Sequence, residues 1–187
     1  MKRGDCMTQG FTEGFVHARH RAIRAEHGHK FKFLAGVYPP MTKIDRFEGE
    51  YRFLSNFFIE PDGTHVEGEY QAAKCANASD AVMFLELSPA SAKRFGKTVK
   101  LRKDWEDVKV PVMRKLVLSK FDDSLELAQR LIATGDAELV EGNWWGDTFW
   151  GVCRGEGRNE LGKILMDVRE IMKKKKIDLE PWPDYPG

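Results

Sequence analysis

The segment GNWWGDTFWGVCRGEGRNELGKILMDVREIM, residues 142–172, carries the strongest signals for the fold. Its second half repeats apolar residues every three or four positions, which places them on one face of a helix that Asn159 would cap. These residues are Leu161, Ile164, Leu165, Val168 and Met172. Its first half is aromatic and interrupted by glycines, which favours a short strand at 149–151. We therefore predict a long final helix that follows turns and short strands.

Upstream of this segment, the pattern predicts further helices separated by turns. A stretch rich in Ala, Gln, Lys and Glu predicts a helix at 67–76. Capping and turn signals predict others at 79–87, 89–96, 111–121 and 124–133. A proline inside a helix costs about 3 kcal/mol, so we place Pro111 in a first turn. Strand character appears at 44–49 and 139–141. The expected fold class is α+β, mainly helical, as a single compact domain with a few short strands.

Composition sets limits on the class of protein. The chain has 187 residues, of which 42% are hydrophobic and 32% charged, as expected for one globular domain. Its formal net charge of +1 provides no strong field toward nucleic acid or acidic membranes. We see no apolar run near 18 residues, no export signal and only three scattered cysteines. These features predict a cytoplasmic protein without a membrane span or a disulfide framework.

The first 40 residues differ from the rest of the chain. They hold seven Lys and Arg residues against three acids, a balance of +4, and four of the five histidines. We interpret residues 1–40 as a basic extension, 41–173 as the domain and 174–187 as a C-terminal tail. The histidines have no cysteine or carboxylate ligands at suitable spacing, so we interpret them as solvated side chains and predict no metal site.

Four groups of residues could carry chemistry. Residues 142–151 join four aromatic side chains to Asp147, which suits base stacking beside a developing positive charge, although core aromatics and a turn would look the same. The glycine-rich turn at 155–162 opens a helix whose N–H groups could bind an anion. Basic residues gather at 97–103. One helix face would carry Glu67, Tyr70, Gln71 and Lys74. Taken singly, the last three groups fit an ordinary turn or solvated surface equally well.

Taken together and in order, these stretches resemble the NADAR family, also called YbiA-like N-glycosidases. The matching blocks are 53–57, 67–74, 88–96, 101–105, 112–121, 139–141 and 147–169. They cover about residues 44–172. One departure concerns the residues before the Tyr70-Gln71 pair, where the family usually has an aromatic residue or His and this chain has Gly68-Glu69. Glu69 is therefore a second carboxylate that competes with Glu67 for the catalytic assignment.

The resemblance implies a mainly helical α+β domain that hydrolyses N-glycosidic bonds to ribose without a metal or another cofactor. It implies Glu67 as the essential acid, Asp147 as the second carboxylate and Trp105 as a ring that stacks on the substrate. The expected substrate-binding residues are Ser55, Asn56, Gln71, Lys74, Arg102, Trp150 and Asn159.

Two substrate classes remain open under this resemblance. One is a small phosphorylated N-riboside, such as the ribosylaminopyrimidine intermediates of riboflavin synthesis. The other is ADP-ribosylated guanine in DNA, for which the basic residues 1–40 could supply a contact. Two alternatives lie outside catalysis: an inactive module that binds ADP-ribose, and a purely structural nucleic-acid-binding protein.

Overall fold

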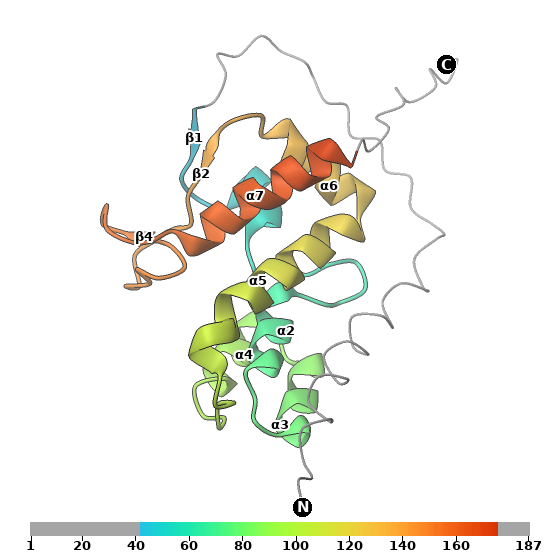
Figure 1. Cartoon of the computed structure of the whole chain (residues 1–187), viewed down its shortest axis with the longest axis vertical. Helices are drawn as coiled ribbons and strands as arrows, with labels where there is room; N and C mark the ends of the chain where they lie inside the picture. Colours follow the sequence, from blue (N-terminus) through green and yellow to red (C-terminus); the bar gives the residue numbers. More distant parts are fainter. Residues whose placement is uncertain (1–41, 176–187) are drawn as a thin grey trace, which may run out of the picture. The chain divides into compact units, whose positions relative to one another are not determined.

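The computed structural model describes residues 42–175, which form a mainly helical α+β domain (Figure 1). Three longer helices lie together: α5 (Trp105–Asp122), α6 (Leu125–Ala133) and α7 (Glu160–Lys174). The shorter helix α2 (Val66–Ala73) packs against α5, and α4 (Pro89–Phe95) packs against α2. The expected fold class is confirmed. The predicted basic extension and most of the predicted tail lie outside the described residues. No helix within 42–175 is long and apolar enough to cross a membrane.

The core forms where α5, α6 and α7 turn their apolar faces to one another. All five residues of the predicted stripe on α7 are buried. Helix α5 contributes Met113, Leu116, Val117 and Phe121, and α6 contributes Leu127, Ala128 and Leu131. Burying a large apolar side chain stabilises a fold by about 1.5–3 kcal/mol. This three-helix core is therefore the main support for the residues around it.

Two small parallel strand pairs flank the core. Strand β1 (Lys43–Ile44) pairs with β2 (Glu138–Leu139), and β3 (Gly142–Asn143) pairs with β4 (Val152–Cys153). The strands expected at 44–49 and 139–141 are thus present only in part. The strand expected at 149–151 is wrong, because the carbonyls of these residues accept hydrogen bonds from the start of α7 and not from a partner strand.

Side-chain caps set the start of several helices, as the sequence predicts. Ser88 Oγ accepts a hydrogen bond from the Ser91 amide at the start of α4, and Ser124 Oγ accepts one from Leu127 at the start of α6. The helix expected at 79–87 is divided into α3 (Ala78–Val82) and the 3-10 helix η3 (Met83–Glu86). A second 3-10 helix, η2 (Gly49–Leu54), begins where the first predicted strand would end.

Helix α5 begins six residues earlier than the sequence predicts. Pro111 lies inside the helix and not in its first turn. The pyrrolidine ring removes the N–H that would donate to the carbonyl of Asp107, but both residues are exposed, so water can hydrate that carbonyl. Burial of Trp105 at the first helical position and the acids of the first turn, which suit the helix dipole, offset the cost of the proline.

Candidate active site

Helix α2 starts at a capping histidine. His65 Nδ1 accepts a hydrogen bond from the Gly68 amide at 2.8 Å, and His65 Nε2 donates to the carbonyl of Leu87 at 2.8 Å. This pair of bonds requires the tautomer with the proton on Nε2. The imidazole lies over Gly68, where a Cβ would come within 2.6 Å of the ring. The cap and this close contact fix the first turn of α2, which carries Glu67.

Glu67 is buried in the domain, with 6% of its surface exposed. Its Oε1 accepts a 2.7 Å hydrogen bond from Gln71 Nε2, one turn further along α2. Burial raises the pKa of Glu67 above its ordinary value, and the Asp147 charge adds to this, while Gln71 and the charges of Lys93 and Lys74 oppose it. A buried carboxyl with a raised pKa is a candidate for proton exchange with a substrate or water.

Gly96, at the end of α4, makes room for two polar side chains of α2. A Cβ at this position would lie 1.9 Å from Gln71 Oε1 and 3.0 Å from Lys74 Nζ. Both side chains therefore pass close to the α4 backbone. Lys74 is half-buried, and desolvation lowers the pKa of its ammonium, while the Glu67 charge raises it. Glu67, Gln71 and Lys74 thus form one polar group, as their shared helix face predicts.

Asp147 lies in the loop between β3 and β4, and Asn143 holds this loop in shape. Asn143 Oδ1 accepts a hydrogen bond from the Asp147 amide at 3.0 Å, and Asn143 Nδ2 donates to the Asp147 carbonyl at 2.7 Å. Asp147 Oδ1 in turn accepts hydrogen bonds from the amides of Phe149 and Trp150 at 3.1 and 2.9 Å. This Asx-type turn fixes the direction of the carboxylate.

Tyr70 is the centre of an aromatic cluster that joins α2, α5 and the loop. Its ring centroid lies 4.9 Å from that of Trp105 and 5.5 Å from that of Trp150. Phe149 packs edge-on against Trp150 at 4.9 Å. Contacts of this kind add about 0.5–1.5 kcal/mol beyond the area they bury. The two tryptophans selected from the sequence therefore both pack on Tyr70, which covers Trp105 so that it is only 6% exposed.

The two carboxylates expected as a pair lie within electrostatic range of each other. The charge of Asp147 helps to raise the pKa of Glu67 and that of Tyr70, although burial is the larger cause for both groups. A hydrogen bond with the Trp150 side chain opposes the shift at Tyr70. Asp147 is therefore part of the electrostatic surroundings of both Glu67 and Tyr70.

Ser55 and Asn56 border α2 just after η2. The Asn56 carbonyl accepts a hydrogen bond from the Glu67 amide at 3.0 Å, and its Nδ2 contacts Met113 Sδ at 3.5 Å. Ser55 Oγ accepts a hydrogen bond from the Phe57 amide at 3.1 Å. Within residues 42–175, the buried Asn56 Oδ1 and Gln71 Oε1 have no hydrogen-bond partner. Buried oxygens of this kind are usually paired, so both are suited to accept hydrogen bonds from a ligand.

Comparison with known proteins identifies the family of this chain. Residues 48–173 match the family model of the NADAR domain. This chain belongs to the NADAR family. The NADAR chain is 39% identical over 138 residues to an N-glycosidase of Nostoc punctiforme, a match that covers 66% of this chain and 86% of the relative. It is 44% identical over 131 residues to the N-glycosidase YbiA of Shigella flexneri, covering 65% and 81%.

Two further matches concern a solved structure and a longer protein. The NMR structure of YbiA from E. coli superposes with a TM-score of 0.64 at 34% identity, covering 74% of this NADAR chain and 89% of that chain. A riboflavin biosynthesis protein of Vibrio vulnificus is 41% identical over 131 residues, covering 65% of this chain and 35% of that protein. By these matches, the NADAR chain is an N-glycosyl hydrolase.

Arg102 of the NADAR chain is engaged by a neighbouring acid. Its guanidinium donates to Asp104 at 2.6 and 2.9 Å, which raises the pKa of Arg102 and lowers that of Asp104. The Arg102 amide donates to the Lys74 carbonyl at 2.9 Å. The backbone of Arg102 is therefore next to the polar group of α2, while its side chain forms a bidentate pair near the surface.

Hydrogen bonds to a neighbouring loop engage several amides of the glycine-rich turn before α7. Four successive amides at this point donate to four carbonyls of the loop that carries Asp147. The donors are Arg158, Asn159, Glu160 and Leu161, and the acceptors are Thr148, Phe149, Trp150 and Gly151. These bonds remove four of the amides that the anion site predicted at 155–162 would use, and that site stays a prediction.

Asn159 begins α7, as the sequence predicts, but its side chain does not cap the helix. Its Nδ2 donates to the Leu139 carbonyl at 2.9 Å, and its Oδ1 accepts a hydrogen bond from the Glu141 amide at 3.1 Å. The backbone is left-handed at this position, with φ at 53°. Both ends of the amide are thus used inside the domain, which makes Asn159 a positioning residue for Glu141.

Two charged residues of the site were not selected from the sequence. Lys93 of α4 places its ammonium 5.5 Å from the Phe57 ring centroid and 5.4 Å from that of Trp145, and its charge lowers the pKa of Glu67 and of Glu141. Glu141 follows β2. Both lie inside blocks that resemble the family, at 88–96 and 139–141, and that resemblance was the only signal that could have identified them.

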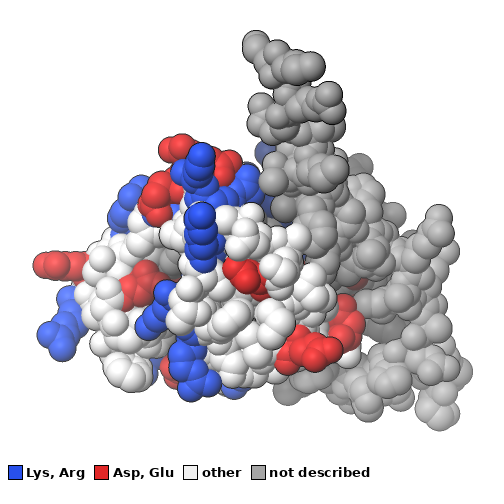
Figure 2. Space-filling model, turned by 90° about the horizontal axis from the view of Figure 1, so that it is seen from below, with Lys and Arg blue, Asp and Glu red and all other residues white. Residues whose placement is uncertain are grey.

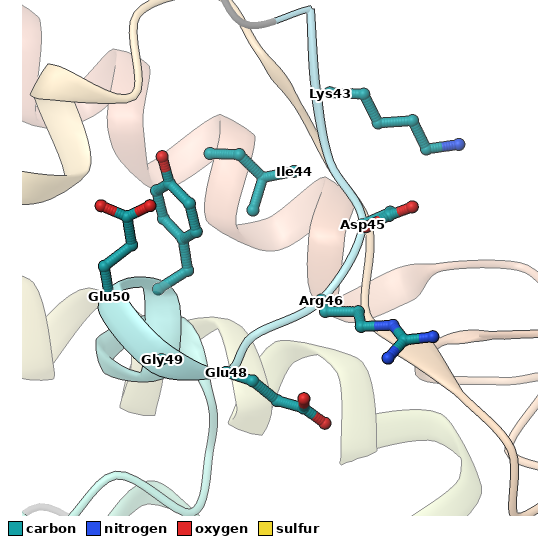
Figure 3. Close-up of a pocket in the computed structure, with 8 residues that line it drawn as sticks. Lys43, Ile44, Asp45, Arg46, Glu48, Gly49 and Glu50 are labelled. Carbon is teal, nitrogen blue, oxygen red and sulfur yellow. The ribbon is translucent and has the colours of Figure 1, made fainter.

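An open hollow of about 410 Å³ lies away from these residues, beside β1 and η2. In Figure 3, Lys43 and Arg46 extend from the β1 segment, whereas Glu48 and Glu50 come from the start of η2. No residue of the expected site lines it. Its charges are of both signs, and the face drawn in Figure 2 likewise mixes acidic and basic side chains. The hollow therefore shows no preference for a phosphorylated ligand.

Within residues 42–175, no three His, Cys, Asp or Glu side chains gather as a metal site. The histidines interpreted as solvated, at positions 17–29, lie outside this range. Cys75 and Cys153 are free thiols, and burial raises the pKa of Cys75 to about 11. Cys75 Sγ contacts the Gln71 carbonyl at 3.4 Å. The thiol is therefore a neutral neighbour of the site.

Proposed function

We propose that this N-glycosidase hydrolyses the bond between ribose C1 and the nitrogen of a phosphorylated N-riboside. The observation that supports it is the buried Glu67 carboxyl, held by Gln71 and within the electrostatic range of Asp147 beside an aromatic cluster. Cleavage of this bond passes through an oxocarbenium-like state, which two carboxylates commonly serve. We also propose that the protein acts in the cytoplasm.

The chemistry assigns different tasks to the two carboxylates. Glu67 either accepts the proton of the attacking water or contacts a ribose hydroxyl, and Asp147 stabilises the positive charge that develops on the ribose ring. The water oxygen bonds to C1 as the C1–N bond breaks, and the bonding electron pair leaves with the nitrogen. A proton then completes the free base, and the sugar departs with a hydroxyl at C1.

Exposed indoles offer a place for the base. Trp105 is covered by Tyr70 and backs the aromatic cluster. Trp145, in contrast, is 48% exposed, and Trp144, which packs against it edge-on at 5.8 Å, is 82% exposed. Both lie two or three residues before Asp147. We assign base stacking to Trp145 and a supporting role to Trp105.

Cationic side chains around the carboxylates are suited to hold the phosphate. Lys74 is half-buried beside Glu67, and Lys93 lies between Phe57 and Trp145. Arg102 would have to exchange its Asp104 partner for the phosphate. Asn56 Oδ1 and Gln71 Oε1 would accept hydrogen bonds from the ribose hydroxyls. Ser55 and Trp150 would line the rest of the binding site.

The relatives' names favour a riboflavin intermediate as the substrate. Besides the protein of Vibrio vulnificus, a chloroplastic riboflavin biosynthesis protein of Zea mays is 38% identical over 118 residues, covering 56% of this chain and 19% of that protein. We therefore propose a ribosylaminopyrimidine phosphate first and ADP-ribosylated guanine in DNA second. For the second substrate, the basic residues 1–40 would contact the nucleic acid beyond the domain at 41–173.

A panel of N-ribosides tests this proposal. The wild-type protein should release ribose phosphate from a ribosylaminopyrimidine phosphate, or ADP-ribose from an ADP-ribosylated guanine oligonucleotide. Glu67→Gln should lose about 10²–10⁴-fold in turnover while keeping the fold, the usual range for an acid–base group. Glu69→Gln tests the competing carboxylate on the same helix, and Glu138→Gln, an exposed acid outside the site, is the control. Full activity of Glu67→Gln would refute the assignment, and tight ADP-ribose binding without release would indicate an inactive module.

A further inference from the structure

Glu141 is a partly buried acid to which no task has been given. Within the described residues, its Oε2 is covered and has no hydrogen-bond partner, although the residue as a whole keeps some exposure. An unpartnered buried oxygen disfavours the charged form of a carboxyl, because nothing replaces its hydration. The side chain is therefore placed to hold a proton rather than to form an ion pair.

The backbone around Glu141 fixes it against the loop that carries Asp147. Its amide donates to Asn159 Oδ1 at 3.1 Å, and its carbonyl accepts from the Val152 amide at 2.9 Å. A Cβ at Gly151 would lie 2.2 Å from the Glu141 carbonyl oxygen and 3.1 Å from its Cγ. The side chain thus packs directly on the backbone of the loop.

The electrostatic surroundings agree with this placement. Burial is the largest influence on Glu141 and raises its pKa to about 7. The charges of Asp147, Glu48 and Glu67 add to the shift, and Lys93 opposes it. These four groups come from the loop, the segment before η2, helix α2 and helix α4. Glu141 is thus an acid whose protonation state changes near neutral pH, a common property of proton donors in enzymes.

We propose that Glu141 is the general acid that protonates the leaving nitrogen. This inference rests on the proposed function. It adds a proton donor for the leaving nitrogen, a task that was assigned to neither Glu67 nor Asp147. The Glu141 carboxyl gives its proton to the nitrogen, which keeps the electron pair of the broken C1–N bond. Water adds to C1 and gives its proton to Glu67. The proton on Glu67 then returns through solvent to Glu141, so the enzyme ends each turnover in its starting state.

The test follows the pH dependence of turnover. The rate of the wild type should fall as pH rises through about 7, because Glu141 must be protonated to act. Glu141→Gln should lose about 10²–10⁴-fold at pH 6 and show no such alkaline limb in its residual rate. Glu141→Asp keeps a proton-bearing carboxyl and should retain the limb at a lower rate. Thermal unfolding at pH 6 verifies that each variant is folded.

The matched control is Glu138→Gln, an exposed acid three residues earlier whose partner is Lys43 at the surface. Its rate and pH profile should equal those of the wild type. A Glu141→Gln protein with the wild-type rate, or with a lower rate but the same alkaline limb, would overturn the role as proton donor and leave the N-glycosidase proposal standing. A wild type that releases nothing from any N-riboside would overturn both.

Discussion

The side-chain amide of Asn159 is hydrogen-bonded to the backbone at Leu139 and at Glu141, and its removal should destabilise the fold. Asn159→Ala removes the hydrogen bonds to the Leu139 carbonyl and from the Glu141 amide. Leaving both backbone groups unpaired costs about 1–1.5 kcal/mol each. Alanine at a φ of 53° adds about 1–2 kcal/mol of left-handed strain. The expected loss is about 3–5 kcal/mol, or roughly 6–20 °C in Tm for a protein of this size.

Asn159→Gly separates the two contributions. Glycine loses the same hydrogen bonds but avoids about 1–2 kcal/mol of strain, against about 0.5–1 kcal/mol for its greater freedom in the unfolded chain. It should therefore be more stable than Asn159→Ala by about 0.5–1 kcal/mol. Asn77→Ala is the control, because Asn77 is an exposed residue at the start of α3 whose side chain does not cap the helix.

Urea unfolding followed by tryptophan fluorescence and far-ultraviolet circular dichroism measures these differences. The reasoning fails if Asn159→Ala costs less than about 1 kcal/mol, the value of a single hydrogen bond. It also fails if Asn159→Gly is the less stable of the two variants, since strain would then have no part in the effect.

Three other predictions concern the site and its supports. His65→Ala should lose about 2 kcal/mol in thermal unfolding from its helix cap and its second hydrogen bond, and His65→Asn should recover part of this. Gly151→Ala should cost about 1–3 kcal/mol and lower turnover, since its Cβ would meet Glu141; unchanged values would contradict the packing. The pKa of Glu141 is raised to about 7 in the folded state, so the fold favours the protonated carboxyl. The stability of the wild type relative to Glu141→Gln should therefore fall by about 3 kcal/mol as pH rises from 4.5 to 7, as measured from urea midpoints.

The sequence predicts best where local rules act. The stripe on α7 and the shared face of Glu67 and Gln71 follow from helical spacing, and both are present. The position of Pro111 follows a local rule as well, but tertiary burial of Trp105 overrides it. Local preference therefore decides these elements only where no larger packing energy opposes it.

Other parts of the site depend on contacts between distant residues. Glu141 follows an apolar pair, and nothing near it in the sequence indicates that Asp147 and Lys93 face it. The turn at 155–159 has the composition of an anion site, but the amides of Arg158 and Asn159 donate to carbonyls of the loop at 148–151. Only the three-dimensional arrangement shows which polar groups remain for a ligand.

The bonding between the Asp147 loop and the start of α7 has a consequence for how the enzyme can open. Four carbonyls of the loop are tied to four amides of the helix, so the loop cannot swing outward unless the first turn of α7 frays with it. Hydrogen exchange at these amides should then report a shared opening event. Shortening α7 at its far end would therefore loosen the Asp147 loop as well as the fold, because this helix also holds the loop in place.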